Sequence, residues 1–314
     1  MTASFEAGVP LARAQSELAA HGQMLAIDPP DGDGAATLGG VFATADSGPL
    51  RHRYGQPRDL VLGITFALGD GTVAKAGSRV IKNVAGYDIA KLFTGSFGTL
   101  GMILSLTVRL HPLPAATITV IGATSEPQRL SAAAVALACA PLELEALDVA
   151  WRAGEGRLLA RVAGAQAARR TQAIERQMRD CALSDVEVVT PDEELWARQR
   201  AGQRSAQRAI VRVACRPAEL GRVLALIDER GGALVGRAAL GASFVEIEPA
   251  EIAWLRRMLP GGAHAVVLDI PETVRSEIDV WGEPDGAALG LMRAVKRRFD
   301  PAAVCGHGVF VGGI

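Results

Sequence analysis

Three glycine-rich clusters in the first hundred residues are the part of this sequence whose residue types could bind a ligand. Glycine has no Cβ and accepts positive φ, so backbone N–H groups at such positions can turn toward an anion or the edge of a flat ring. Tight turns need the same residues, and a turn is the better explanation for any single cluster. The clusters are Thr37-Leu38-Gly39-Gly40, Ser47-Gly48 with Tyr54-Gly55, and Gly95 to Gly101.

These clusters differ from two common nucleotide-binding motifs. The chain has no G-x-x-x-x-G-K-[ST] loop, and no cluster has the G-x-G-x-x-G spacing at the start of a helix. The sequence therefore disfavours a P-loop nucleotidase and an ordinary Rossmann dehydrogenase.

In their order along the chain, the clusters resemble the second half of the FAD-binding domain of the vanillyl-alcohol-oxidase superfamily, also called the PCMH type. The stretch Ile81-Lys82-Asn83-Val84-Ala85-Gly86-Tyr87-Asp88 is similar to the FAD-binding (GlcE-type) subunits of glycolate oxidase. The resemblance is close over residues 2–114 and loose toward the C-terminus. It implies that FAD is the cofactor.

The resemblance also implies a set of flavin contacts, because the glycine clusters of that family line an extended FAD. The T-x-G-G and S-G segments would lie near the pyrophosphate and the isoalloxazine, and the G-T-L-G strand near the adenine. No metal site is expected, and no catalytic residue can be assigned. The candidate contacts are Thr37, Gly39, Gly40, Ser47, Gly48, Tyr54, Gly55, Lys82, Asn83, Gly98, Thr99, Gly101 and Ile103.

Some polar residues have two interpretations of about equal weight. Lys82 could stabilise an anionic reduced flavin. Alternatively, Tyr87 and Asp88 cap a helix over 89–93 and Lys82 lies in solvent. His52 and His307 could titrate near a flavin, but solvated loops explain both histidines more simply.

Turn signals and apolar runs predict the elements of the first part. We expect a strand over 2–6, a helix over 11–20, a hairpin of 60–68 with 72–76, and a strand over 100–110. The proline pair in 111–114 ends this region. The predicted domain 1–114 is a PCMH-type FAD-binding domain that lacks its N-terminal part, including the glycine-rich loop that wraps the pyrophosphate in the family.

The remaining residues predict an α+β cap domain over 115–314. A β-α-β-β-α-β order occurs twice, in 117–189 and in 209–268, which favours two ferredoxin-like units or one sheet built from both. A final helix over 286–299 is expected to return to the FAD lobe. The overall fold class is α+β.

Composition excludes several classes of protein. A net charge of −1 over 314 residues provides no basic surface for nucleic acid. Four dispersed cysteines, none in a C-x-x-C pair, indicate neither a zinc site nor an iron–sulfur cluster, and they favour a reduced cytoplasmic protein. No apolar run is long enough to span a membrane.

The resemblance predicts an FAD-dependent subunit of a glycolate-oxidase-type complex that oxidises glycolate or a related D-2-hydroxy acid. Its expected partners are a sister FAD-binding subunit and an iron–sulfur subunit, and the complex could associate with a membrane. A non-catalytic assembly subunit that cannot hold FAD alone is the alternative. A standalone flavin oxidase acting on another alcohol is a third, weaker hypothesis.

Overall fold

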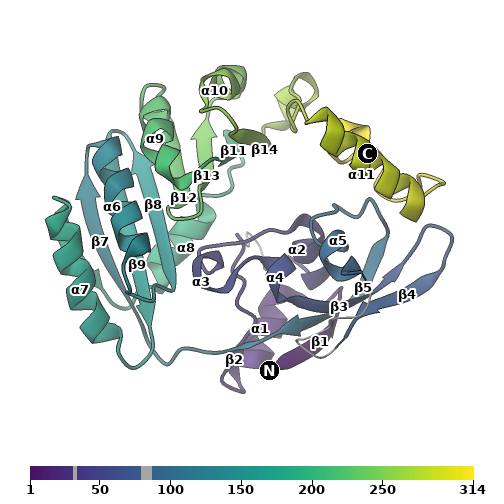
Figure 1. Cartoon of the computed structure of the whole chain (residues 1–314), viewed down its shortest axis with the longest axis horizontal. Helices are drawn as coiled ribbons and strands as arrows, with labels where there is room; N and C mark the ends of the chain where they lie inside the picture. The colour runs from purple at the N-terminus through teal and green to yellow at the C-terminus, as the bar shows by residue number, and fades with distance from the viewer. Residues whose placement is uncertain (31–33, 79–86) are drawn as a thin grey trace. The chain divides into compact units, whose positions relative to one another are not determined.

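The computed structural model describes residues 1–30, 34–78 and 87–314 and divides into two units, each with its own hydrophobic core (Figure 1). Unit 1 comprises Met1–Leu113 and Trp281–Ile314, and unit 2 comprises Pro114–Val280. The predicted contacts Lys82 and Asn83 lie outside the described residues. No helix among the described residues is both long enough and apolar enough to cross a membrane.

Unit 1 is built on an antiparallel sheet in the order β1-β5-β3-β4. The strands are β1 (Thr2–Glu6), β3 (Val61–Ala67), β4 (Val73–Gly77) and β5 (Met102–Arg109), and β2 (Gln23–Met24) pairs separately with β6 (His111–Pro112). The β3–β4 hairpin and the strands predicted at 2–6 and 100–110 are thus confirmed. Alternation along β3 places Ile64 and Phe66 in the core.

Short helices complete the core of unit 1. They are α1 (Leu11–Ala19), α2 (Leu38–Thr44), α3 (Arg51–Tyr54), α4 (Pro57–Leu60), α5 (Ile89–Phe93) and α11 (Gly286–Phe299). The apolar spacing of α1 buries Leu11, Ala14 and Leu18, as its helical periodicity predicts. Phe42 of α2 and Phe93 of α5 are fully buried at the centre. Helix α11 adds Val295 and Phe299 to this core, although it comes from the far end of the chain.

Unit 2 is one eight-stranded sheet in the order β10-β7-β9-β8-β12-β13-β11-β14. Its first half is β7 (Thr117–Thr124), α6 (Pro127–Cys139), β8 (Ala146–Arg152), β9 (Glu155–Ala163), α7 (Ala167–Asp180) and β10 (Ser184–Val189). Its second half is β11 (Ala209–Ala214), α9 (Leu220–Asp228), β12 (Ala233–Arg237), β13 (Ala242–Ile247), α10 (Ile252–Met258) and β14 (His264–Asp269). Both predicted β-α-β-β-α-β rounds are therefore present, and antiparallel pairing of β8 with β12 joins them into one sheet.

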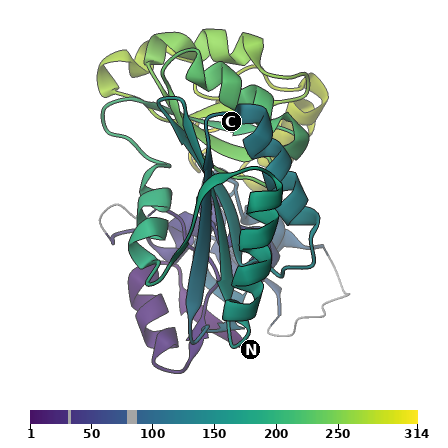
Figure 2. The ribbon, with the colours of Figure 1, turned by 90° about the vertical axis from the view of Figure 1, so that its left-hand side faces the viewer.

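The two faces of this sheet are covered differently. Helices α6, α7, α9 and α10 pack on one face, where alternate strand residues such as Val149 and Val245 form the main core (Figures 1 and 2). The opposite face carries α8 (Glu193–Ala201), whose buried Trp196 packs on Ile121, Ala146 and Leu159. Four 3-10 helices complete the described chain: η1 (Pro217–Glu219), η2 (Pro249–Glu251), η3 (Glu272–Glu277) and η4 (Val311–Gly313).

Candidate cofactor site

A cavity of about 320 Å³ lies in unit 1 where the end of β1, the start of α2 and the loop before β5 meet. Its lining is almost entirely small or apolar, so backbone forms much of its wall. The lining residues are Ala7, Gly8, Thr37, Gly39, Gly40, Ala43, Ser96, Gly98, Gly101, Met102 and Ile103.

Thr37 and Gly39 set the start of α2 against the end of β1. The Thr37 hydroxyl oxygen accepts a hydrogen bond from the Gly40 amide at 3.2 Å and caps the helix. The Gly39 amide donates to the Ala7 carbonyl at 2.8 Å, and a Cβ on Gly39 would come within 2.8 Å of the Ala7 Cβ. Glycine at position 39 therefore allows the helix to pack directly on the strand end.

The loop from Gly95 to Gly101 forms the other wall. It docks on the end of α2, since the Gly95 amide donates to the Phe42 carbonyl and the Phe97 amide to the Ala43 carbonyl, each at 2.9 Å. Gly98 has a φ of +72°, and a Cβ there would meet nothing within 4 Å. Position 98 therefore needs glycine for its backbone conformation, and its backbone is open on the side where a side chain would point.

The C-terminal segment holds this loop in place. Lys296 of α11 is buried, and its Nζ donates to the Thr99 carbonyl at 2.8 Å, to Asp300 Oδ2 at 2.6 Å and to the Cys305 carbonyl at 2.7 Å. Phe97 also packs on Trp281, with ring centroids 5.2 Å apart. The loop conformation therefore depends on residues that follow it by nearly two hundred positions.

Six of the predicted flavin contacts line this one cavity. Two clusters that are separated by more than fifty residues in the sequence are thus brought together. The six are Thr37, Gly39, Gly40, Gly98, Gly101 and Ile103.

Ser47 and Gly48 do not line the cavity. Ser47 is buried, and a Cβ on Gly48 would stand 1.7 Å from the Asp28 carbonyl oxygen. Asp28 Oδ1 also accepts the Leu50 amide at 3.0 Å. Close packing against residue 28 therefore accounts for the glycine at position 48.

Tyr54, Gly55 and Thr99 also have structural environments away from the lining. The Tyr54 ring lies 4.7 Å from the His111 ring, centroid to centroid. Gly55 ends α3 with a φ of +83°. Thr99 is buried, and its hydroxyl donates to the Ser96 carbonyl at 2.7 Å.

The helix-cap interpretation holds for Asp88 within the described residues. Asp88 caps α5 by accepting the Lys91 amide at 3.4 Å, and it pairs with Lys91 Nζ at 2.9 Å. Tyr87, by contrast, is 95% exposed. The alternative role of Lys82 at a flavin concerns a residue outside the described ranges.

Neither candidate histidine lines the cavity. Burial, and then the neighbouring Arg53 guanidinium, lower the pKa of His52 below its ordinary value, so its imidazole is neutral at neutral pH. His307 is exposed in the C-terminal turn. Among the described residues that line the cavity none has an ionisable side chain, so these residues offer a ligand mainly shape and backbone groups.

Sequence reasoning missed five lining residues: Ala7, Gly8, Ala43, Ser96 and Met102. Ala43 follows Gly40 by three positions, so helical periodicity would have placed it on the same face of α2. Ala7 and Gly8 directly follow the predicted strand 2–6. Their position at the end of a strand was the signal that could have identified them as lining residues. Among the described residues, no group of three or more His, Cys, Asp or Glu side chains could hold a metal.

Comparison with known proteins finds partial sequence similarity to FAD-binding proteins and a shared fold. Residues 1–77 match the family described as FAD binding domain. Glycolate oxidase subunit GlcE of Escherichia coli (strain K12) is 40% identical over 111 residues, which is 35% of this chain and 32% of that protein. The mitochondrial cytochrome D-lactate dehydrogenase of Arabidopsis thaliana is 40% identical over 109 residues, covering 35% of this chain and 19% of that protein.

A solved structure shares the fold of nearly the whole chain. Alkyldihydroxyacetonephosphate synthase superposes with a TM-score of 0.67 at 14% identity, covering 97% of this chain and 64% of the synthase. The predicted α+β fold with a PCMH-type FAD-binding lobe is confirmed. The match of residues 1–77 to an FAD-binding domain and the similarity to a glycolate oxidase subunit indicate FAD as the cofactor. The aligned part spans a third or less of the curated relatives named here.

Proposed function

We propose that this chain is an FAD-dependent subunit of a glycolate-oxidase-type complex, and that the complex oxidises glycolate or a related D-2-hydroxy acid to the 2-oxo acid. The observation that carries the proposal is the cavity that joins Thr37, Gly40 and Gly98, and the partial similarity of the chain to a glycolate oxidase subunit and a D-lactate dehydrogenase supports it. The proposed partners are a sister FAD-binding subunit and an iron–sulfur subunit.

The residues present suit a neutral, backbone-lined flavin contact. Neither Gly8 nor Gly98 would bring a Cβ within 4 Å of any neighbour, and the side chains of Ala7 and Ala43 are small. A flat ring or a diphosphate can therefore approach the main chain closely. When bound, FAD supplies the two-electron acceptor for the oxidation of a hydroxy acid.

In this proposal the chain's own residues bind and orient the cofactor. Thr37 and Gly39 fix the start of α2, Lys296 fixes the loop before β5, and the cavity lies between these two elements. Oxidation of a hydroxyl also needs a group that accepts its proton. The described lining residues include no ionisable side chain, so we propose that this group is supplied by residues other than these.

The test is to tag the chain, purify it with its partners from the native organism and measure extracted FAD, protein-bound iron and glycolate-dependent dye reduction. We expect FAD on this chain and turnover of glycolate or D-lactate. If the complex oxidises its substrate while this chain carries no flavin, the result would instead support the alternative that the chain is a non-catalytic assembly subunit.

A matched pair of glycine variants tests the cavity itself. Gly98→Ala and Gly71→Ala carry the same kind of backbone strain, since φ is +72° and +85° and neither Cβ would touch a neighbour within 4 Å. Only Gly98 lines the cavity. We expect Gly98→Ala to lower FAD occupancy at least several-fold and Gly71→Ala to leave it unchanged. Equal FAD occupancy in both variants would contradict the proposal that FAD contacts this cavity.

A further inference from the structure

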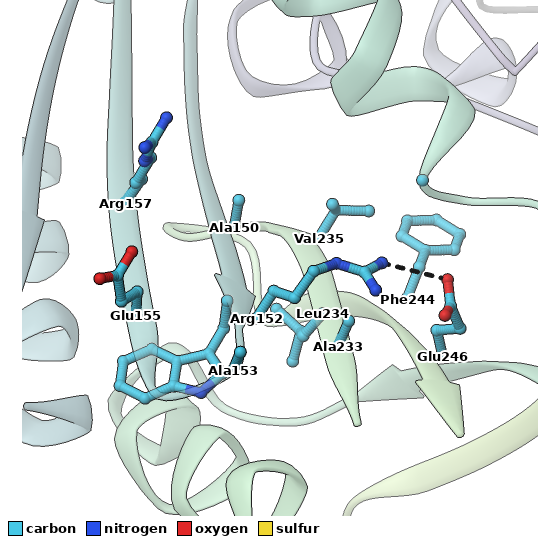
Figure 3. A pocket seen from close by; sticks show the side chains of 12 residues that line it. Ala150, Arg152, Ala153, Glu155, Arg157, Ala233, Leu234, Val235, Phe244 and Glu246 are labelled. Atoms are coloured by element: carbon cyan, nitrogen blue, oxygen red, sulfur yellow. Dashed lines mark hydrogen bonds and ion pairs between the residues drawn. The ribbon is translucent and has the colours of Figure 1, made fainter. Parts of the chain in front are cut away.

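A second cavity, of about 330 Å³, lies in unit 2 on the face of the sheet that carries α8 (Figure 3). Its floor is formed by Ala150 of β8 and by Ala233 and Val235 of β12, and Ala150 is paired with Val235 across the two strands. Larger residues flank this floor. Figure 3 shows Arg152 reaching across Ala233 toward Glu246, where its Nη2 lies 3.3 Å from Oε2.

A buried polar cluster adjoins this cavity. Arg237 is 2% exposed and Asp148 is 0% exposed, and they form an ion pair with Arg237 Nη1 2.6 Å from Asp148 Oδ2. Gln199 Nε2 also donates to Asp148 Oδ2, at 3.1 Å. These three side chains form a buried polar cluster on the sheet.

Several atoms of the cluster have no hydrogen-bond partner within the described chain. They are Nε and Nη2 of Arg237 and Oδ1 of Asp148. The Nε–H and Nη2–H groups lie on the same edge of the guanidinium. Such an edge can donate two parallel hydrogen bonds to one carboxylate. Leaving such donors unpaired inside a protein is costly, so a ligand that pairs with them gains affinity.

Two residues connect the cluster to the cavity, Val235 and Phe244. Val235 lines it and precedes Arg237 by two strand positions, so both side chains lie on one face of the sheet. The Phe244 ring lines it and has the Arg237 guanidinium 5.4 Å from its centroid.

We propose that unit 2 binds a small monocarboxylate with an apolar body in this cavity. The carboxylate accepts both hydrogen bonds from Nε and Nη2 of Arg237, and the apolar body lies on Ala150, Ala233 and Val235. Entry of the carboxylate requires the Phe244 ring to turn aside. The site uses residues of unit 2 alone, so it does not depend on the flavin proposed for unit 1.

The first test compares three probes on the full chain by saturation-transfer NMR and titration calorimetry. We expect 4-methylpentanoate to bind. We expect 4-methylpentanamide, which lacks the charge, to bind on the order of ten-fold more weakly or worse. Glycolate, which lacks the apolar body, should also bind more weakly. Absence of 4-methylpentanoate binding, or equal binding of the acid and the amide, would overturn the proposal.

The second test separates the buried guanidinium from the rim of the cavity. Arg237→Lys keeps a cation beside Asp148 but removes the two-donor edge, and Ala150→Leu fills the floor without touching the cluster. We expect each variant to lower the affinity for 4-methylpentanoate about ten-fold or more. Arg169→Lys is the control, because Arg169 is exposed on α7 and does not line the cavity, so affinity should stay within about two-fold of wild type.

Melting curves establish that each variant folds. Wild-type affinity in a folded Arg237→Lys variant would place the carboxylate elsewhere and contradict the assignment. Wild-type affinity in Ala150→Leu would exclude the cavity floor. If Arg237→Lys does not fold, the Ala150→Leu variant and the acid–amide comparison still decide the outcome.

Discussion

Two glycines of unit 1 show how one residue type serves two physical purposes. Gly98 has a positive φ and faces open space beside the candidate cofactor cavity. Gly48 lies against the backbone of Asp28, where any Cβ would overlap a carbonyl oxygen. Substituting Gly98 should therefore affect a ligand, whereas substituting Gly48 should affect packing.

Asp148 makes the stability of unit 2 depend on pH. Burial raises its pKa to about 6, although Arg237 and Gln199 act in the opposite direction. Because the folded-state pKa lies above the ordinary value of 3.8, the folded state takes up a proton more readily than the unfolded state. The contribution of Asp148 to the free energy of unfolding should therefore fall as pH rises from about 4 to about 6.

The Asp148→Asn variant tests whether ionisation of Asp148 lowers the free energy of unfolding. Asparagine resembles the protonated acid, so the variant should match the wild type near pH 4 and exceed its stability at pH 7, by up to about 3 kcal/mol. Urea unfolding at both pH values measures the difference. A variant less stable than the wild type at pH 7 would show that the ion pair with Arg237 outweighs the cost of burial.

At the scale of elements, a buried ion pair helps to attach α11 to unit 1, together with Val295 and Phe299 in the core. Most of the helix surface is exposed, yet Lys296 is buried and contacts both Asp300 and the Thr99 carbonyl. Burial disfavours a charged Asp300, but hydrogen bonds from Lys296 and from the Cys305 and Val304 amides outweigh it and hold the pKa of Asp300 below its ordinary value. The pair thus ties the end of the chain to the glycine loop.

Lys296→Met should destabilise unit 1 by on the order of 3 kcal/mol, because it leaves the Asp300 carboxylate buried without its cation. Arg297→Met is the control. Arg297 is exposed on the same helix, so this change should stay within about 0.5 kcal/mol of wild type. Denaturant unfolding followed by circular dichroism measures both. Equal stability of the two variants would show that the buried pair does not hold α11.

At the scale of the whole chain, two separate cores should unfold separately. The core of unit 1 contains residues such as Phe42 and Phe93, and that of unit 2 contains Trp151 and Val245, without shared members. Unit 2 is continuous in sequence, whereas unit 1 is assembled from both ends of the chain. Each core therefore has its own hydrophobic driving force.

FAD should raise the unfolding midpoint of unit 1 and leave that of unit 2 unchanged. A ligand present at a hundred times its Kd stabilises the state that binds it by about 2.7 kcal/mol. Trp281 is the single tryptophan of unit 1, so Trp281→Phe assigns the fluorescence transitions. If FAD shifts both transitions equally, the two cores unfold as one.

Local patterns in the sequence determined most of the elements. Turn residues and apolar alternation predicted the β3–β4 hairpin, the helix α1 and both β-α-β-β-α-β rounds of unit 2, because these signals act over a few neighbouring residues. The resemblance to a known family predicted the FAD-binding lobe. It also named Thr37, Gly40 and Gly98, in the glycine clusters, as candidate flavin contacts.

Tertiary structure alone decided which of those glycines meet at a cavity and which pack against backbone. It also decided that β8 and β12 join the two halves of unit 2 into one sheet, that Lys296 reaches Thr99, and that two donors of the buried Arg237 have no partner within the described residues. The physical reason is that local sequence sets φ, ψ and amphipathicity. Contacts between residues far apart in the chain depend on how the finished elements pack.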